Sequence, residues 1–140
     1  TTAPSAGAPA QRFEGKILEI RAPDPATRWR ITGAQVERSI DAGTTWTSVP
    51  TGVSVEILAG VAPSASICWL VGRGGVVLLT TDGATWQRVT APDTTDLSAI
   101  RATDGRNATV TTVDGREFAT TDAGRTWIRR ELQENRPASF

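Results

Sequence analysis

The chain has 140 residues, 39% of them hydrophobic and 21% charged, as is ordinary for a single globular domain. Fifteen basic residues balance fifteen acidic ones, which excludes the basic surface typical of a nucleic-acid binder. No apolar run reaches the roughly 18 residues of a membrane span, so we expect this segment to make no membrane contact. Cys68 is the single cysteine, which leaves no internal disulfide, and its apolar neighbours predict a buried side chain.

In chain order, residues 1–12 are small and rich in Pro and Ala, which indicates a linker. Because the sequence opens on threonine, we expect it to be a piece of a longer protein. Apolar and β-branched runs then alternate with Gly, Asp and Pro through three units, at about 13–50, 51–91 and 92–133, before a tail at 134–140. The predicted strands are 16–20, 29–32, 35–40 and 45–49; 53–59, 67–71, 76–81 and 85–89; and 97–102, 108–113, 117–121 and 126–130.

One phrase occurs three times, at spacings of 40 and 41 residues between its tryptophans. Its copies consist of Ser39, Asp41, Gly43, Thr45 and Trp46; Thr80, Asp82, Gly83, Thr85 and Trp86; and Thr120, Asp122, Gly124, Thr126 and Trp127. Another tryptophan precedes the tryptophan of the motif by 17 residues in the first two units, and the same count in the third unit falls on Val110. Four strands in each unit of about 40 residues predict an all-β, β-propeller-like fold with three blades.

The residue types of the phrase suit a hairpin. The aspartate can accept hydrogen bonds from the backbone N–H groups ahead of it, and the glycine can adopt a positive φ without a steric clash. The threonine favours the following strand, and we expect the tryptophan to turn inward and pack in the core. The three aspartates are therefore interpreted as turn residues and not as titrating acids.

This phrase resembles the Asp-box of sialidases, sortilin-type receptors and many glycoside hydrolases, where it connects the last two strands of a propeller blade. A tighter resemblance, carried by Trp69-Leu-Val-Gly72 and by Leu79 through Trp86, is to the photosystem II stability/assembly factor family and its non-photosynthetic bacterial relatives. The resemblance covers residues 14–131. It implies a protein built of propeller blades and, as in some bacterial relatives, an extracytoplasmic domain behind a membrane anchor, including proteins that resemble anti-sigma factors.

Closed rings in that family have about seven blades, and a ring needs at least four. Three blades leave two sheet faces without a neighbour. Two copies can complete a six-bladed ring, or three sheets can pack as a compact monomer. We favour self-association, as a dimer.

Catalytic chemistry is not indicated. Sialidases use a tyrosine nucleophile, and this chain has none; the absence of histidine excludes a Ser/His/Asp triad and histidine-based metal sites. Asp93 with Asp96, and Asp104 with Asn107, resemble fragments of calcium loops but offer too few oxygen ligands, so turn formation is expected. Gly72-Arg-Gly-Gly75 is expected to be a hairpin because a strand follows it instead of a helix. We expect no metal and no cofactor.

The arginines are the candidate binding surface. Arg28, Arg30, Arg73 and Arg116, with Arg101 and Arg106, lie near loops or strand ends of successive units, and clustered they could engage an acidic protein segment. Scattered charges balanced by carboxylates are the alternative. The sequence thus predicts a non-catalytic protein- or peptide-binding scaffold, the extracytoplasmic part of an anchored bacterial protein of the assembly-factor or anti-sigma kind. The alternative is a carbohydrate-binding or hydrolase-associated fragment, which would use Trp29 or Trp69.

Overall fold

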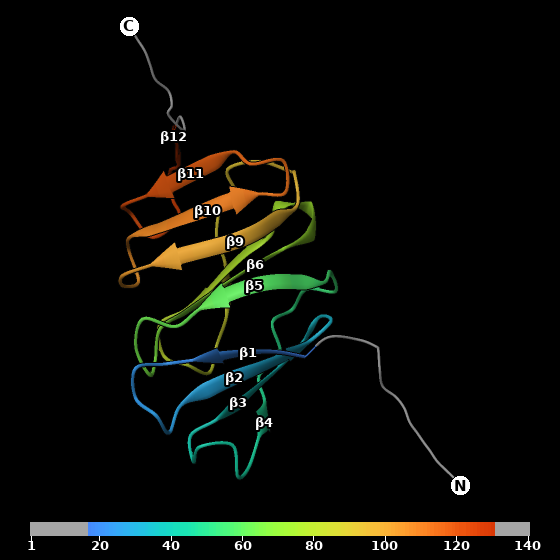
Figure 1. Ribbon diagram of the computed structural model, residues 1–140, viewed down its shortest axis with the longest axis vertical. Helices are drawn as coiled ribbons and strands as arrows, with labels where there is room; N and C mark the ends of the chain where they lie inside the picture. The colour runs from blue at the N-terminus through green and yellow to red at the C-terminus, as the bar shows by residue number, and fades with distance from the viewer. Residues whose placement is uncertain (1–16, 131–140) are drawn as a thin grey trace, which may run out of the picture.

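The computed structural model describes residues 17–130, which form three four-stranded antiparallel sheets (Figure 1). Each sheet is a meander in which consecutive strands are neighbours. The first sheet comprises β1 (Ile17–Arg21), β2 (Arg28–Thr32), β3 (Gln35–Ser39) and β4 (Thr47–Ser48); the second, β5 (Ile57–Val61), β6 (Cys68–Gly72), β7 (Val77–Thr80) and β8 (Gln87–Arg88); the third, β9 (Leu97–Ala102), β10 (Ala108–Thr112), β11 (Glu117–Thr120) and β12 (Ile128–Arg130). This confirms the predicted all-β class and the three four-stranded units. The predicted linker and tail lie outside the described residues.

Strand positions follow the hydrophobic runs closely, with one displacement. We expected the first strand of the second unit at 53–59, whereas β5 begins at Ile57. The strand starts there because its partner ends there: Ile57 pairs with Gly72, the last residue of β6. Residues 53–56 therefore have no neighbouring strand to complete their hydrogen bonds. A short 3₁₀ turn, η2 (Arg73–Gly75), connects β6 to β7.

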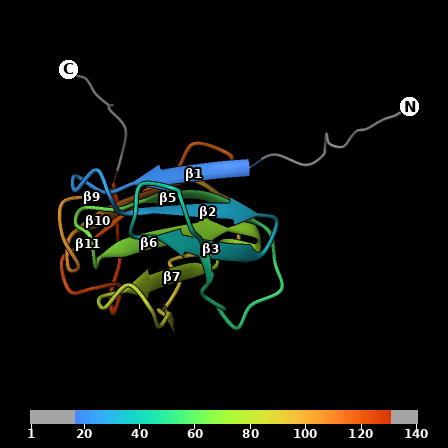
Figure 2. The same cartoon turned by 90° about the horizontal axis from the view of Figure 1, so that it is seen from below.

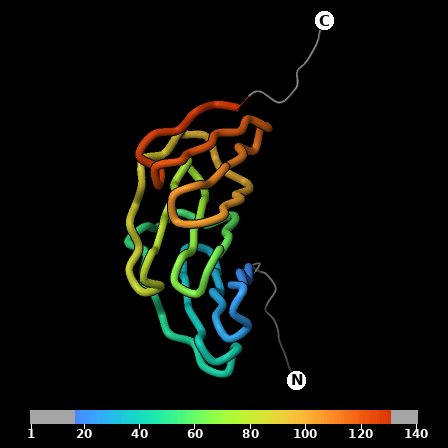
Figure 3. The backbone as a smooth tube through the Cα atoms, turned by 90° about the vertical axis from the view of Figure 1, so that its left-hand side faces the viewer, coloured from blue at the N-terminus to red at the C-terminus, as the bar shows by residue number. Residues whose placement is uncertain are grey.

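The sheets stack face to face in chain order (Figures 1 and 3), and β1, β5 and β9 lie along the same side of the stack (Figure 2). The second sheet is sandwiched between the other two. All residues of β6 and β7 are buried, whereas β10 and β11 of the third sheet alternate between buried and half-buried. This pattern follows from the stack, because the middle sheet has a neighbour on each face.

Two hydrophobic interfaces result. We call the contact between the first and second sheets the first interface, and that between the second and third sheets the second interface. Trp29, Ile31 and Val36 pack against Cys68, Leu70 and Leu78 in the first. Trp69, Val71, Val77 and Leu79 pack against Ile100, Val110 and Phe118 in the second. Cys68 is fully buried, and burial raises the pKa of its thiol, which keeps it neutral.

The tryptophans differ from expectation. Trp29 and Trp69, inside the sheets, are 0% exposed. The motif residues Trp46, Trp86 and Trp127 are only half-buried. They follow the hairpins that lead into the short outer strands β4, β8 and β12, where each sheet ends and less protein covers them. The strongest core residues are therefore the tryptophans outside the repeated phrase.

Sheet pairing also corrects the alignment of the third unit. Trp69 pairs with Leu79, and Thr109 pairs with Ala119, which holds the place of Leu79 relative to its own hairpin. Thr109, and not Val110, is thus the counterpart of Trp69. Because successive strand residues point to opposite faces, this one-residue difference decides which side of the sheet is apolar.

The two outer faces of the stack are consequently polar for the most part. On the first sheet, Arg30 lies opposite both Glu19 and Glu37, and residues opposite each other share a face. On the third sheet, Thr109 lies between Arg101 and Ala119 in the ladders. The first and third sheets therefore present mainly charged or small side chains outward, as terminal repeats of stacked proteins do. Two large apolar side chains are exposed among them, Ile17 on the first sheet and Ile128 on the third.

Candidate functional site

The Asp-box hairpins hold their carboxylates in turn-forming hydrogen bonds. In the first, Asp41 accepts from the hydroxyl of Thr45 at 2.5 Å and from its backbone N–H at 2.9 Å, while the Ser39 hydroxyl donates at 2.8 Å. These donors lower the pKa of Asp41 from 3.8 to about 2. Asp122 makes the same contacts to Thr126 and Thr120, and its pKa is likewise lowered to about 2.

The second hairpin is one residue shorter, and its carboxylate takes a further backbone donor. Asp82 accepts from the N–H groups of Ala84 and Thr85, both at Oδ1, and these lower its pKa strongly. Gly83 has a φ of 77°, so the turn needs a residue without a Cβ there. Carboxylates committed to turns and held ionised in this way are not general acids or bases.

The carboxylates considered as calcium ligands also serve turns. Asp93 accepts from the N–H groups of Thr94 and Thr95, and Asp104 from those of Arg106 and Asn107. Across residues 17–130 no three His, Cys, Asp or Glu side chains gather in a way that could hold a metal ion. The same stretch has no helix of the length and apolarity needed to cross a membrane.

The four arginines proposed as a binding face fall into two separate pairs. Arg28 and Arg30 lie on β2, on the outer face of the first sheet. Arg28 donates to Glu19 at 3.2 Å, and Arg30 donates to Glu37 at 2.7 Å while its guanidinium stacks over the Trp46 ring at 4.2 Å. Both cations are therefore already matched by neighbours on their own sheet.

Arg73 and Arg116 lie in the turns that precede β7 and β11, whereas the Asp-box hairpins follow these strands. The two arginines therefore lie at the strand ends opposite the Asp-boxes. Arg73 donates to Glu56 at 2.8 Å and to Asp96 at 3.1 Å. Arg116 donates to Asp93 at 2.6 Å and to Asp114 at 3.1 Å. The loop before β9 carries both Asp93 and Asp96, so these ion pairs brace the second sheet against the third. They neutralise the two cations in doing so.

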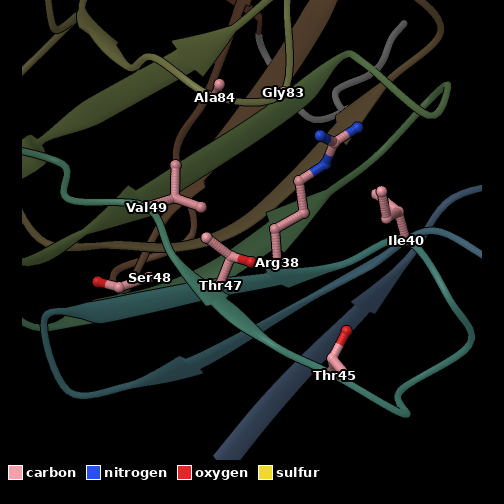
Figure 4. A pocket seen from close by; sticks show the side chains of 8 residues that line it. All are labelled: Arg38, Ile40, Thr45, Thr47, Ser48, Val49, Gly83 and Ala84. Atoms are coloured by element: carbon pink, nitrogen blue, oxygen red, sulfur yellow. The ribbon is translucent and has the colours of Figure 1, made fainter.

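Sequence reasoning missed another arginine, Arg38. It lies on β3 directly opposite Trp29, so its side chain faces the second sheet and not solvent. It lines a pocket of about 200 Å³ between the outer edge of the first sheet and the Asp-box hairpin of the second (Figure 4). The other lining residues are Ile40, Thr45, Thr47, Ser48, Val49, Gly83 and Ala84.

Arg38 has few partners for a guanidinium in this position. Its Nη2 donates to the carbonyl of Ala65 at 2.8 Å, and its guanidinium carbon lies 5.4 Å from the centre of the Trp29 ring. Its Nε is buried and has no hydrogen-bond partner among the described residues. None of the ion pairs within residues 17–130 includes it. The pocket thus contains a cation without a counter-charge.

A signal for Arg38 was present in the sequence. β3 alternates, with Val36 and Arg38 on the face that packs against the second sheet. At the matching place before the second Asp-box the residue is Leu79, which is buried in the second interface. In the third unit the residue at this position is Ala119, so an arginine departs from the small or apolar pattern of the other two units. Departures from a repeat pattern are expected mainly at functional or strained positions.

Comparison with known proteins bears on the fold and the family. Residues 12–135 match the model of the family described as photosynthesis system II assembly factor YCF48. Two solved structures have the same fold. One, "YCF48 bound to D1 peptide", is 21% identical with a TM-score of 0.70 over 82% of this chain and 40% of its own. The other, YCF48 from Cyanidioschyzon merolae, is 19% identical with a TM-score of 0.71 over 86% and 41%.

No curated protein matched. The chain spans about two fifths of the length of the two solved structures. Its match to the family model, by contrast, covers nearly all of its own length, including all three repeats. The family is one of assembly factors and not of enzymes, and the predicted resemblance is confirmed. The chain belongs to the YCF48 photosystem II assembly factor family.

Proposed function

We propose that this chain is a non-catalytic module that binds a protein or peptide segment in the pocket between its first two sheets. The observation that carries the proposal is Arg38, a guanidinium without a counter-charge between apolar and hydroxyl-bearing walls. Peptide sites commonly combine apolar surface with a few polar groups that fix orientation. A family member solved with a bound D1 peptide supports the same kind of partner.

The proposal includes the setting expected from the sequence, the extracytoplasmic part of an anchored bacterial protein of the assembly-factor or anti-sigma kind. The Pro/Ala-rich composition of residues 1–12 supports a tether. Protease treatment of intact cells producing the tagged natural protein tests this setting. Digestion of the module without lysis is expected, and protection until lysis would contradict it.

Self-association stays a prediction. It rested on two sheet faces left without a neighbour. These outer faces carry the ion pairs of Arg30 with Glu37 and of Arg101 with Glu117, together with the exposed Ile17 and Ile128. Pairing of two copies would therefore combine charged and apolar contacts. Light scattering at several protein concentrations decides the matter, since one chain has a mass of 14.9 kDa.

The carbohydrate alternative gains no support from the tryptophans that would serve it. Sugars stack on exposed rings, and Trp29 and Trp69 are 0% exposed. A glycan array probed with the same protein tests this alternative.

The test of peptide binding is a selection from a random peptide library on immobilised protein. We expect an enriched sequence class whose binding is lost in Arg38→Leu and retained in Arg88→Leu. Arg88 is the matched control because it is exposed on β8 and does not line this pocket. An enriched class that binds both variants alike would move the site elsewhere, and no enrichment together with glycan binding would contradict the proposal.

A further inference from the structure

The two interfaces follow one plan, yet they differ in how their buried donors are satisfied. In the second interface the indole N–H of Trp69 donates to the carbonyl of Asp104 at 2.9 Å, and that of Trp127 to the carbonyl of Thr90 at 2.6 Å. In the first interface the equivalent indoles, Trp29 and Trp86, have no acceptor among the described residues. Both of these N–H groups are buried.

Arg38 accounts for part of this difference. Its Nη2 occupies the Ala65 carbonyl in the loop between β5 and β6, and the corresponding loop of the third sheet supplies the carbonyl that accepts from Trp69. The Nε of Arg38 is itself unpaired. The first interface thus holds three of the four buried side-chain donors that lack an acceptor within residues 17–130; the fourth is the Nε of Arg28.

Buried donors without acceptors are uncommon and costly, and a buried positive charge adds to the cost. Of the three donor residues only Arg38 lines the pocket, and the group that would complement its guanidinium is an acceptor that carries negative charge. A carboxylate has both properties, because it accepts at two oxygens and pairs with a guanidinium in two parallel hydrogen bonds.

The shape of the pocket limits what carries the carboxylate. Its volume of about 200 Å³ holds a group the size of one amino-acid side chain and not an extended ligand. Val49 and Ile40 supply apolar wall, and Ile40 is 66% exposed although it is large and hydrophobic. In Figure 4 the Arg38 side chain extends away from β3 towards the level of Gly83, with Ile40 to one side.

Gly83 lies directly against the guanidinium. A Cβ built on this residue would lie 2.5 Å from the guanidinium carbon of Arg38, so a side chain there would require the arginine side chain to move. The equivalent glycine of the second interface, Gly124, faces Val89 and no charge.

We propose that the pocket binds a carboxylate borne on a short apolar group, offered by a peptide either as its C-terminal residue or as an acidic side chain. This inference specifies the ligand of the proposed function and depends on that function only for the statement that the ligand is a peptide. The preference for a carboxylate is argued from Arg38 and the residues that line the pocket around it.

A pair of small probes isolates that chemistry. Isovalerate and its neutral isostere isovaleramide are titrated at pH 7 into ¹⁵N-labelled protein, with the Arg38 Nε–H and the Trp29 and Trp86 indole N–H resonances as reporters. We expect saturable shifts of these signals with isovalerate and none with isovaleramide. Arg38→Leu is expected to weaken isovalerate binding roughly 10-fold or more, and Arg88→Leu to leave it unchanged.

N-acetyl-leucine and N-acetyl-aspartate amide then separate the two sources of the carboxylate. Saturable binding of the first assigns the pocket to a peptide C-terminus, and binding of the second assigns it to an acidic side chain; binding of both supports the proposal for either source.

Absence of binding by all three carboxylates would overturn the proposal, as would equal binding of isovaleramide or undiminished binding by a folded Arg38→Leu variant. The peptide selection can still succeed on another surface in that event, so failure of the carboxylate site and failure of the proposed function are distinguishable.

Discussion

The first and second interfaces are built from the same parts and differ at one decisive position. Each places a fully buried tryptophan of one sheet beside the Asp-box hairpin of the next. In the second interface Leu79 occupies the matching position and lines a pocket of about 290 Å³, and the rings of Trp69 and Trp127 meet edge to face at 6.5 Å. In the first, Arg38 stands in place of the leucine, and three buried donors of this interface have no acceptor among the described residues. The comparison separates what the repeat needs for folding from what it tolerates at one site.

The most severe test of this difference between the interfaces is to place an arginine in the second interface. Leu79→Arg places a charge in an interface whose donors are all satisfied, and Leu79 is only 3% exposed. We expect a loss of about 3 kcal/mol or more in the free energy of unfolding, because the new cation has no counter-charge. Urea denaturation measures the loss.

Leu79→Met is the control, since it keeps the volume and should cost less than about 1.5 kcal/mol. If Leu79→Arg cost no more than Leu79→Met, the second interface would accommodate a cation as readily as the first does. The special character assigned to Arg38 would then fail.

The reverse exchange, Arg38→Leu, is expected to stabilise the protein by about 1–2 kcal/mol, because it removes a buried unpaired donor and frees the Ala65 carbonyl for Trp29. The same variant loses carboxylate binding, so stability and function move in opposite directions. Arg88→Leu, on exposed surface, should change stability by less than about 0.5 kcal/mol in the same urea experiment. A destabilised Arg38→Leu would mean that the guanidinium packs productively in the free protein.

Much of the fold could be predicted from the sequence, because hydrophobic alternation and turn residues determine local structure. The three Asp-boxes fixed the unit length, and the strand runs followed to within a few residues. The fifth strand was displaced because a strand's limits depend on its partner, and Gly72, which ends that partner, is distant in sequence. The identity of Thr109 as the match of Trp69 was missed for a related reason. Counting residues cannot detect an insertion that only strand pairing reveals.

The candidate site was less predictable, because it depends on what lies across an interface. Arg73 and Arg116 are arginines near loops, as a binding surface requires, but carboxylates from neighbouring segments neutralise them. Arg38 lies in the middle of a predicted strand and was not included in the candidate binding surface. Its role depends on Trp29 beneath it, Gly83 beside it and the absence of a facing carboxylate, and none of these is encoded in its immediate sequence.

The two buried tryptophans test whether the two interfaces differ in hydrogen bonding. Trp69→Phe removes an indole N–H bonded to Asp104, whereas Trp29→Phe removes one that lacks an acceptor. Both lose a similar apolar area, so the difference reports the hydrogen bond. We expect Trp69→Phe to cost about 1 kcal/mol more than Trp29→Phe in urea denaturation. Equal costs would indicate that the Trp29 N–H finds an acceptor in solution, and the donor imbalance of the first interface would disappear.

Acid should destabilise the Asp-box hairpins of the first and third sheets to a similar extent. Arg38 would then remain the main difference between the two interfaces. Asp41 and Asp122 both have pKa values lowered from 3.8 to about 2. A carboxyl whose pKa is lower in the folded state contributes stability that is complete above pH 4 and is lost as the pH falls towards 2, because the unfolded chain then binds the proton first. The urea midpoint should therefore drop over this range, and Asp41→Asn and Asp122→Asn should each lower the midpoint at pH 7 and flatten the drop by a similar, small amount. Unequal responses would locate the difference between the ends of the stack in their hairpins, and would weaken the claim that a single arginine distinguishes the first interface from the second.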